Sequence, residues 1–225
     1  MVSLTLTCHA SDKVLLAAED SWPPYSGPNG QGISQQTIVE AYHAVNVEVD
    51  FVVVPYARAL QMVKSGEVDG AFNVTKQHST VEQFRFGREP LIKAQASFYY
   101  SPISALQLNS INDAPDGTVI ALILGYEYGE LYELNRHRFK EIRVSNQQQI
   151  INLLRKNRVD LAIMFDRVAA YYIQQMELPE HSIRQGNTNH ISDIYVAFNK
   201  DKPSLPPLID KLDQGLRLIR TLTPP

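Results

Sequence analysis

The chain has 225 residues, of which 44% are hydrophobic and 20% charged, a balance typical of a globular protein with one large or two modest cores. Its net charge of −3, without any run of Lys or Arg, disfavours nucleic acid as a partner. No apolar stretch approaches the ~20 residues that a membrane-spanning helix needs, so we expect a small molecule as the main partner.

The first ten residues are typical of the end of a secretory signal peptide. A cut after Ala10 would leave small residues, Cys8 and Ala10, at the −3 and −1 positions. We therefore expect residues 1–10 to be a signal remnant and the protein to be exported to the periplasm. Because Cys8 is the single cysteine, we expect no disulfide and no cysteine-based metal site. The stretch is short and lacks a basic start, so an ordinary frayed N-terminus remains the alternative.

Strands and helices alternate over the first part of the chain. The spacing of apolar residues predicts, in order, a strand at 13–18, a helix at 33–45 capped by Ser34, a strand at 47–54, a helix at 57–64 and a strand at 70–74. This order implies a parallel sheet with right-handed crossovers. The loops after these strands, which hold Trp22, Tyr56 and residues 73–75, should then share one edge of the sheet.

The first of these loops, residues 19–30, contains three prolines and two glycines. Its two consecutive prolines restrict the backbone, so Trp22 and Tyr25 are displayed at low entropic cost. Two interpretations remain open for these rings: an aromatic wall for a ligand, or an anchor of the loop to the core. A dinucleotide fingerprint is rejected because Gln35 stands where its third glycine should be.

A second series of strands and helices follows. The predicted elements are a short helix at 78–84, strands at 94–101, 118–124, 142–144, 160–165 and 193–198, and helices ending at 136 and spanning 147–156, 167–176 and 205–222. The strands near residues 96 and 196 stand apart from the rest, which indicates crossovers between two lobes. We expect residues 11–97 and 198–225 to form one lobe and residues 98–197 to form an inserted second lobe.

An internal repeat supports this division. Residues 64–75 and 155–166 share a pattern in which an amphipathic helix, a turn, Val-Asp and an apolar strand follow one another, with an offset of 91 residues. Thr75 and Asp166 are therefore counterparts at the ends of two strands. Open α/β sheets bind ligands beyond the carboxyl ends of their strands, so the repeat predicts one site shared by two lobes. The alternative is that such units recur in any α/β protein.

With these motifs, the chain after residue 12 resembles the family 3, polar-amino-acid type of periplasmic solute-binding proteins, which serve ATP-driven importers. The resemblance is carried by Trp22-Pro23-Pro24-Tyr25, residues 66–70 before Thr75, residues 86–91, and Val159-Asp160 leading to Asp166. It implies a two-lobed α/β fold of periplasmic binding protein type II, with mainly parallel sheets joined by two hinge strands. It also implies a monomer without cofactor, which captures a small amino-acid-like or amine ligand for the membrane permease of an ABC importer.

The resemblance also implies roles for single residues. Trp22 and Tyr25 would sandwich the ligand, Asp166 would pair with its ammonium group, and the loop 125–129 would offer backbone N–H groups at a helix start. The expected ligand-binding residues are Trp22, Tyr25, Tyr56, Arg58, Phe72, Asn73, Thr75, His78, Gly125, Tyr126, Tyr128 and Asp166.

Two departures from the family pattern put an ordinary α-amino acid ligand in doubt. His78 replaces the arginine of Thr-x-x-Arg, whose guanidinium grips a ligand carboxylate, and Gln36 stands near the place of a common aspartate. Arg58, at the start of a helix, is the candidate to take over anion binding. The alternative is that Arg58 is a solvated helix residue.

Catalysis is not indicated. The sequence holds no Gly-x-Ser-x-Gly, no phosphate-binding loop and no His-Glu-x-x-His, and its six histidines are widely spaced, so we expect neither enzyme nor metal site. Two alternatives to transport stay open. The same fold could report a solute to a membrane signalling receptor, or, less favoured, act as a small periplasmic dehydratase or hydrolase with Asp166 and Glu127 as an acid–base pair.

Overall fold

The computed structural model describes residues 12–179 and 181–222. The expected signal remnant, residues 1–10 with Cys8, lies outside the described residues. The elements, in chain order, are β1 (Asp12–Glu19), α1 (Ile33–His43), β2 (Val47–Val54), α2 (Tyr56–Ser65), β3 (Gly70–Thr75), α3 (His78–Val81), β4 (Phe84–Phe86), β5 (Ile92–Tyr100), β6 (Val119–Ile123), α4 (Glu130–Asn135), β7 (Lys140–Val144), α5 (Gln147–Arg155), β8 (Leu161–Phe165), α6 (Asp166–Gln175), β9 (Arg184–Asn199) and α7 (Leu205–Leu222), with short 3-10 turns at Ile111–Asp113 and Arg136–Arg138.

The described strands form one nine-stranded sheet in the order β2-β1-β3-β9-β5-β8-β6-β7, and β4 pairs with β9. Each half contains three parallel strands: β1 pairs with β2 and β3, and β6 pairs with β7 and β8. Between the halves, β5 and β9 run antiparallel to each other. The predicted α/β class is confirmed.

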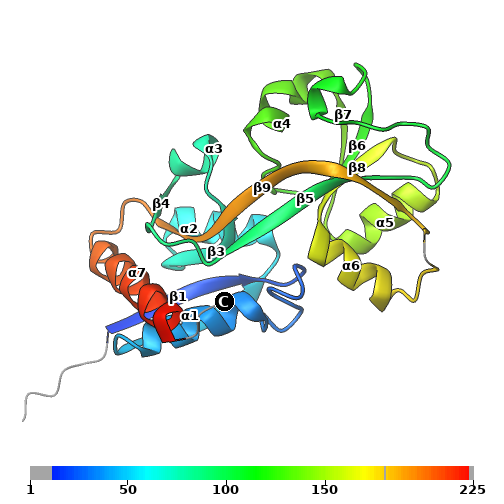
Figure 1. Cartoon of the computed structure of the whole chain (residues 1–225). Helices are drawn as coiled ribbons and strands as arrows, with labels where there is room; N and C mark the ends of the chain where they lie inside the picture. The colour runs from blue at the N-terminus through cyan, green and yellow to red at the C-terminus, as the bar shows by residue number, and fades with distance from the viewer. Residues whose placement is uncertain (1–11, 180, 223–225) are drawn as a thin grey trace, which may run out of the picture.

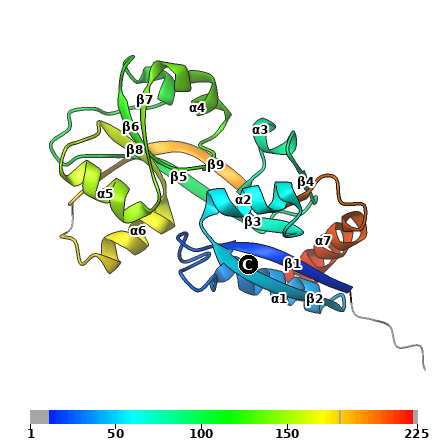
Figure 2. The same ribbon diagram turned by 180° about the vertical axis from the view of Figure 1, so that it is seen from behind.

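Two lobes are plain in Figure 1, with β5 and β9 passing between them, and the view from behind agrees (Figure 2). We call the part with β1 to β4, α1 to α3 and α7 the first lobe, and the part with β6 to β8 and α4 to α6 the second lobe. The expected boundaries near residues 97 and 197 both fall within the two connecting strands, and they stay a prediction.

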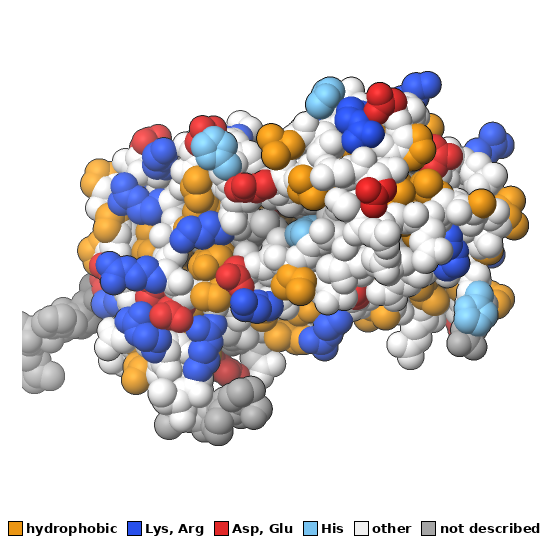
Figure 3. Space-filling view, turned by 45° about the horizontal axis from the view of Figure 1, so that its top comes forward, with side chains coloured by type: hydrophobic (Ala, Val, Ile, Leu, Met, Phe, Trp, Pro, Cys, Tyr) orange, Lys and Arg blue, Asp and Glu red, His pale blue; other side chains and the backbone are white. Residues whose placement is uncertain are grey.

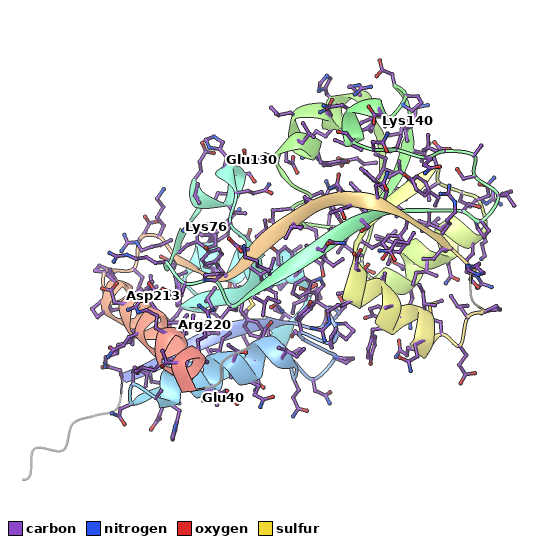
Figure 4. The ribbon with its side chains drawn as sticks, viewed as in Figure 1. Glu40, Lys76, Glu130, Lys140, Asp213 and Arg220 are labelled. Atoms are coloured by element: carbon purple, nitrogen blue, oxygen red, sulfur yellow. The ribbon has the colours of Figure 1, made fainter. Side chains whose placement is uncertain are left out.

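The C-terminal helix α7 belongs to the first lobe, where it packs against α1. Its Asp213 is buried and accepts hydrogen bonds from the backbone N–H groups of Arg88 (2.9 Å) and Glu89 (3.0 Å). Figure 4 shows Asp213 and Arg220 on this helix. Leu212 and Leu216 complete the apolar cluster that α1 and β1 begin. The core of the first lobe thus combines residues of β1 and α1 with residues of α7.

Three local expectations are wrong. The strand expected at 193–198 extends from Arg184 to Asn199, because its first half pairs with β5 although its side chains are mostly polar. The helix expected at 78–84 ends at Val81, and Phe84 instead begins β4, which gains hydrogen bonds by pairing with β9. Ser34 does not cap α1; Gly32 holds the cap position, and Ser34 is buried inside the first turn.

Both copies of the repeat have the expected order of helix, turn and strand. The turn residue has a left-handed backbone in each copy, with φ of 77° at Gly66 and 50° at Asn157. The strands that follow, β3 and β8, are fully buried. No helix within residues 12–179 and 181–222 is both long and apolar enough to cross a membrane.

Candidate functional site

A narrow inner hollow, with room for about one water molecule between the lobes as they stand, lies where the two lobes meet. The first lobe lines it with side chains from the ends of its strands and the start of α2, and the second lobe does so with the loop after β6 and the end of β8. The lining residues are Trp22, Tyr56, Asn73, Thr75, Tyr126, Glu127 and Phe165. The carboxyl ends of strands from both lobes thus converge, which is where open α/β sheets hold ligands.

The loop that carries Trp22 is folded tightly on itself. The N–H of Trp22 donates to the carbonyl of Ser26 (2.8 Å), the N–H of Ser26 donates back (2.9 Å), and the Pro23–Pro24 peptide bond is cis. The Trp22 ring is 1% exposed and lies 4.5 Å from the Tyr25 ring, so this conformation leaves no room for a ligand between the two. The Trp22 ring also meets the ring of Phe165 from the second lobe edge to face, with 5.0 Å between the ring centroids.

Two reciprocal tyrosine–glutamate hydrogen bonds cross from lobe to lobe. The hydroxyl of Tyr56 in the first lobe donates to Glu127 in the second (2.6 Å), and the hydroxyl of Tyr126 in the second lobe donates to Glu19 in the first. The two tyrosine rings meet edge to face at 4.8 Å. Each lobe therefore offers the other one donor and one acceptor, and together these bonds connect the two lobes beside the inner hollow.

The carboxyl groups of Glu19 and Glu127 both have a pKa above the ordinary value for glutamate. Burial raises the pKa of Glu19 to about 8, and the charges of Asp20 and Glu127 act in the same direction, whereas the bond from Tyr126 opposes them. Burial likewise raises the pKa of Glu127 to about 7, although the hydroxyl of Tyr56 opposes it. At neutral pH the cleft therefore contains carboxyl groups that hold protons and can release them when a cation approaches.

Two further hollows continue the inner one toward the surface. The middle hollow shares Thr75 with the inner one, and the outer hollow shares Gln77 and Glu130 with the middle one. The three form one cleft between the lobes, and the space-filling view shows this furrow with a recessed histidine (Figure 3). Lys76 and Glu130 border the middle hollow from opposite lobes (Figure 4).

Buried polar atoms without a partner gather on this cleft. Within the described part of the chain, six of them belong to lining residues: Nε1 of Trp22, Oδ1 and Nδ2 of Asn73, Oε1 of Gln77, Nε2 of His190 and Oδ1 of Asp193. Of these, Oδ1 of Asp193 lies 3.4 Å from the ammonium of Lys93, and the other five have no such charge partner among the described residues. Asn73 has a left-handed backbone (φ of 67°) at an irregularity of β3, which turns its amide away from the regular ladder. Such groups cost stability unless another molecule satisfies them.

The side chain of His190 comes from the connecting strand β9. Burial lowers the pKa of His190 to about 4, so its ring is neutral at physiological pH. Its Nδ1 lies 2.7 Å from the amide nitrogen of Asn189, which leaves Nε2 directed to other partners. A neutral ring can accept or donate one hydrogen bond here but supplies no positive charge.

Several expected site residues lie away from the inner hollow. Phe72 packs against Phe51 in the core of the first lobe, and the Tyr128 hydroxyl accepts the N–H of Ile123 inside the second lobe. The carboxylate of Asp166 accepts hydrogen bonds from Gln95 (2.8 Å), Ser97 (3.1 Å) and Tyr99 (3.2 Å) on β5.

The two candidate anion-binding residues are also placed elsewhere. Arg58 forms an exposed ion pair with Glu67 (3.0 Å) on the surface of the first lobe. His78 lines only the outer hollow, where its exposed ring faces Glu82 (3.2 Å).

The glycine-aromatic loop, residues 125–129, docks onto the first lobe. A Cβ at Gly125, where φ is 87°, would approach Ala57 to 3.1 Å, and one at Gly129 would approach His190 to 3.2 Å. Glycine at both positions permits the close contact that brings Tyr126 and Glu127 into the cleft.

Sequence reasoning missed Glu19, Gln77 and His190. Glu19 ends β1 directly before the Trp22 loop, so the strand-end rule that selected Trp22 could have found it. The strand-end rule could not have found His190, because the first half of β9 is polar and its sequence does not predict a strand.

Comparison with known proteins identifies the fold. Scans against protein-family models and against curated proteins both give no match. An ancestral arginine-binding protein bound to arginine superposes with a TM-score of 0.77 at 18% identity, covering 95% of this chain and 94% of that one. A histidine kinase sensor domain with similarity to periplasmic binding proteins gives 0.77 at 15% identity, with 93% and 91% covered.

An amino acid ABC transporter substrate-binding protein from Streptococcus pneumoniae, bound to L-arginine, gives a TM-score of 0.74 at 17% identity, with 93% and 90% covered. At these identities the likeness shows the fold. The periplasmic-binding-protein fold expected from the sequence is therefore confirmed.

Proposed function

We propose that this protein is an extracytoplasmic solute-binding protein that captures a small polar, amino-acid-like or amine ligand between its lobes. The observation that carries the proposal is the set of unpartnered buried atoms of Trp22, Asn73, Gln77 and His190 along one cleft. Each such atom costs about 1–3 kcal/mol while it is unsatisfied. A ligand with complementary donors and acceptors would recover that free energy, and this favours binding.

Within this proposal the protein acts as a monomer in the periplasm and delivers its ligand to the membrane permease of an ABC importer. The similar protein from Streptococcus pneumoniae is such a substrate-binding protein. We propose binding rather than catalysis, with lobe boundaries near residues 97 and 197. The lobes would open at β5 and β9 to admit the ligand and close over it.

Sensing is the second candidate function. The histidine kinase sensor domain superposes as well as the ancestral arginine-binding protein does, with a TM-score of 0.77 in each case. A sensor and a transport protein would use the same cleft and differ in the membrane partner that recognises the closed lobes.

The proposal is tested by thermal unfolding with a panel of amino acids, amines, organic acids, sugars and short peptides. A ligand at one hundred times its Kd should add about 2.7 kcal/mol to the free energy of unfolding. Asn73→Gly keeps a residue suited to the left-handed backbone and removes the unpartnered amide, so it should abolish most of the shift. Asn157→Gly is the matched control, because Asn157 is also left-handed but is exposed in the second lobe.

Two results would contradict the proposal. Either no compound of the panel shifts the unfolding temperature, or a compound shifts it equally in the native protein and in Asn73→Gly.

A further inference from the structure

We propose that the ligand is an amine cation without a carboxylate group, and that Glu127 and Glu19 are its counter-charges in the inner hollow. This inference rests on the proposed function and specifies the ligand class of the same site. It is carried by the acids, the aromatic walls, the unpartnered atoms and the placement of the basic side chains around the cleft.

One acidic side chain lines the inner hollow, and a second lies one hydrogen bond behind it. Glu127 lines it, and Glu19 lies directly behind the hydroxyl of Tyr126, which also lines it. Among the described residues that line the hollow none is Lys or Arg. Arg143 acts on Glu127 only through space, because its guanidinium donates to Glu141 (2.8 Å) and to the carbonyl of Ile123 (3.2 Å). The hollow therefore has negative charge available and no cation of its own to match it.

The walls suit a cation with an apolar body. Four aromatic rings, those of Trp22, Tyr56, Tyr126 and Phe165, surround the space beside the acids. Ring faces attract ammonium and guanidinium groups, and the attraction grows when water is excluded. A buried cation also needs an acidic partner, because an isolated ion is strongly disfavoured away from water.

The unpartnered atoms indicate independently that a molecule binds at this place. Trp22 and Asn73 both line the inner hollow and are 1% and 5% exposed. The indole Nε1 of Trp22 and both polar atoms of the Asn73 side-chain amide have no hydrogen-bond partner in the described part of the chain. The indole N–H requires an acceptor, and the Asn73 amide offers one donor and one acceptor. The ligand thus carries at least one N–H donor and one acceptor atom besides its charge.

Within the inner hollow, the described lining residues include no Lys or Arg that could pair with a ligand carboxylate, and the lysine of the cleft, Lys76, lines the middle hollow instead. The ammonium of Lys76 donates to the carbonyl of Gly87 (3.2 Å) and lies over the Tyr195 ring at 4.9 Å. His190 is neutral, and His78 faces Glu82 at the exposed rim. A ligand carboxylate in the inner hollow would lie beside the carboxyl group of Glu127, and two adjacent carboxyl groups in a water-poor site do not both ionise readily.

The experiment compares amino acids with their decarboxylated amines by calorimetry on the full chain: histidine with histamine, and serine with ethanolamine, because both amines keep an acceptor atom besides the ammonium group. We expect at least one amine to bind at least ~10-fold more tightly than its amino acid, a difference of about 1.4 kcal/mol. Glu127→Gln and Glu19→Gln should each weaken that amine about 30-fold or more, as expected for loss of a desolvated charge partner. Glu48→Gln, an exposed change on β2, is the control and should leave the affinity unchanged.

Glutamine can accept the same tyrosine hydroxyl, so both variants should fold, which the unliganded unfolding temperature checks. Should either unfold, Tyr56→Phe is the second variant: it leaves Glu127 in place and removes the hydroxyl that competes with the cation. Amine affinity should then rise, and an unchanged or lower affinity would overturn the inference.

The outcomes separate the inference from the proposed function. If the amino acids or an organic acid bind at least as well as the amines, or if both glutamine variants retain full amine affinity, the amine class is wrong while the binding function stands. If no compound of the wider panel binds, the binding function itself is contradicted.

Discussion

Asp160 holds the start of β6 in the same way that Asp69, 91 residues earlier, holds β1. The Asp69 carboxylate accepts the N–H of Leu15 (2.8 Å), and the N–H of Asp69 donates to the Leu15 carbonyl (2.8 Å). In the second copy Asp160 makes both bonds with Val119, at 2.7 and 2.9 Å. The Val-Asp step of the repeat is thus a clamp between a turn and the neighbouring strand.

Replacing the two aspartates should have unequal effects on stability. Asp69 is buried and also pairs with Lys202, whereas Asp160 is exposed. We expect Asp69→Ala to lower the free energy of unfolding by about 1–3 kcal/mol, because it leaves a buried N–H without its acceptor. Asp160→Ala should cost less, about 0.5–1 kcal/mol, since water can replace the carboxylate. Urea denaturation measures both, and equal losses would show that burial does not set the difference.

The left-handed turn before each clamp gives a second prediction. A Cβ at Gly66 would meet only the Asn199 side chain, at 3.8 Å, so a substitution there is limited by the backbone rather than by space. Gly66→Ala should therefore cost about 1 kcal/mol. Gly66→Asn should cost less, because Asn157 already occupies the equivalent position with φ of 50°. Thermal unfolding measures the stability of the two variants, and a larger loss of stability for Gly66→Asn than for Gly66→Ala would refute the backbone argument.

The acids of the cleft should make stability depend on pH. The folded pKa values of Glu19 and Glu127, about 8 and about 7, lie above the ordinary value of 4.5, so the folded state binds these protons more tightly than the unfolded chain does. Their contribution is fully present below pH 4.5 and is lost as pH rises through the folded values. The free energy of unfolding should therefore fall from pH 5 to about pH 8.

The Glu19→Gln variant separates the contribution of Glu19 from that of other titrating groups. Glu19→Gln should flatten the pH profile between pH 5 and 8 relative to the native protein, as measured by urea denaturation. Parallel profiles of the two proteins would mean that Glu19 titrates normally in the folded state.

Trp22 should report the opening of the lobes. It is the single tryptophan, and the Phe165 ring that contacts it at 5.0 Å belongs to the other lobe. Phe165→Ala removes this contact, so the Trp22 emission maximum should move to longer wavelength, as expected when water reaches the indole. Tyr172→Phe, which alters a contact of α6 with the first lobe outside the inner hollow, is the control and should leave the emission unchanged. Identical spectra of Phe165→Ala and the native protein would contradict the contact between the lobes.

Much of the fold could be predicted from the sequence, because most elements carry a strong local pattern. The β-branched run of β2 and the amphipathic α7 have the expected bounds, 47–54 and 205–222. The first half of β9 could not be predicted, since its polar residues are held in strand geometry by pairing with β5 rather than by local preference. Its side chains are partly exposed, so they show no alternation of apolar residues.

The candidate site was predictable in position but not in composition. The strand-end rule indicated Trp22 and residues 73–75, of which Trp22, Asn73 and Thr75 border the inner hollow. The pairing of Glu19 with Tyr126 depends on how the two lobes close, over 107 positions of sequence, and no local pattern records it. Asp166 shares the repeat position with Thr75, but it begins α6, where β5 supplies hydrogen-bond donors that take up its carboxylate.

The arrangement of β9 and α7 has a consequence for the order of synthesis. As the chain leaves the ribosome, β6 to β8 and their helices emerge while β3 still lacks β9, its neighbour in the sheet, and α1 still lacks α7. Domains generally assemble as units during translation, when their parts are available. The first lobe is therefore completed after the second one, when β9 and then α7 have emerged and α7 can pack on α1.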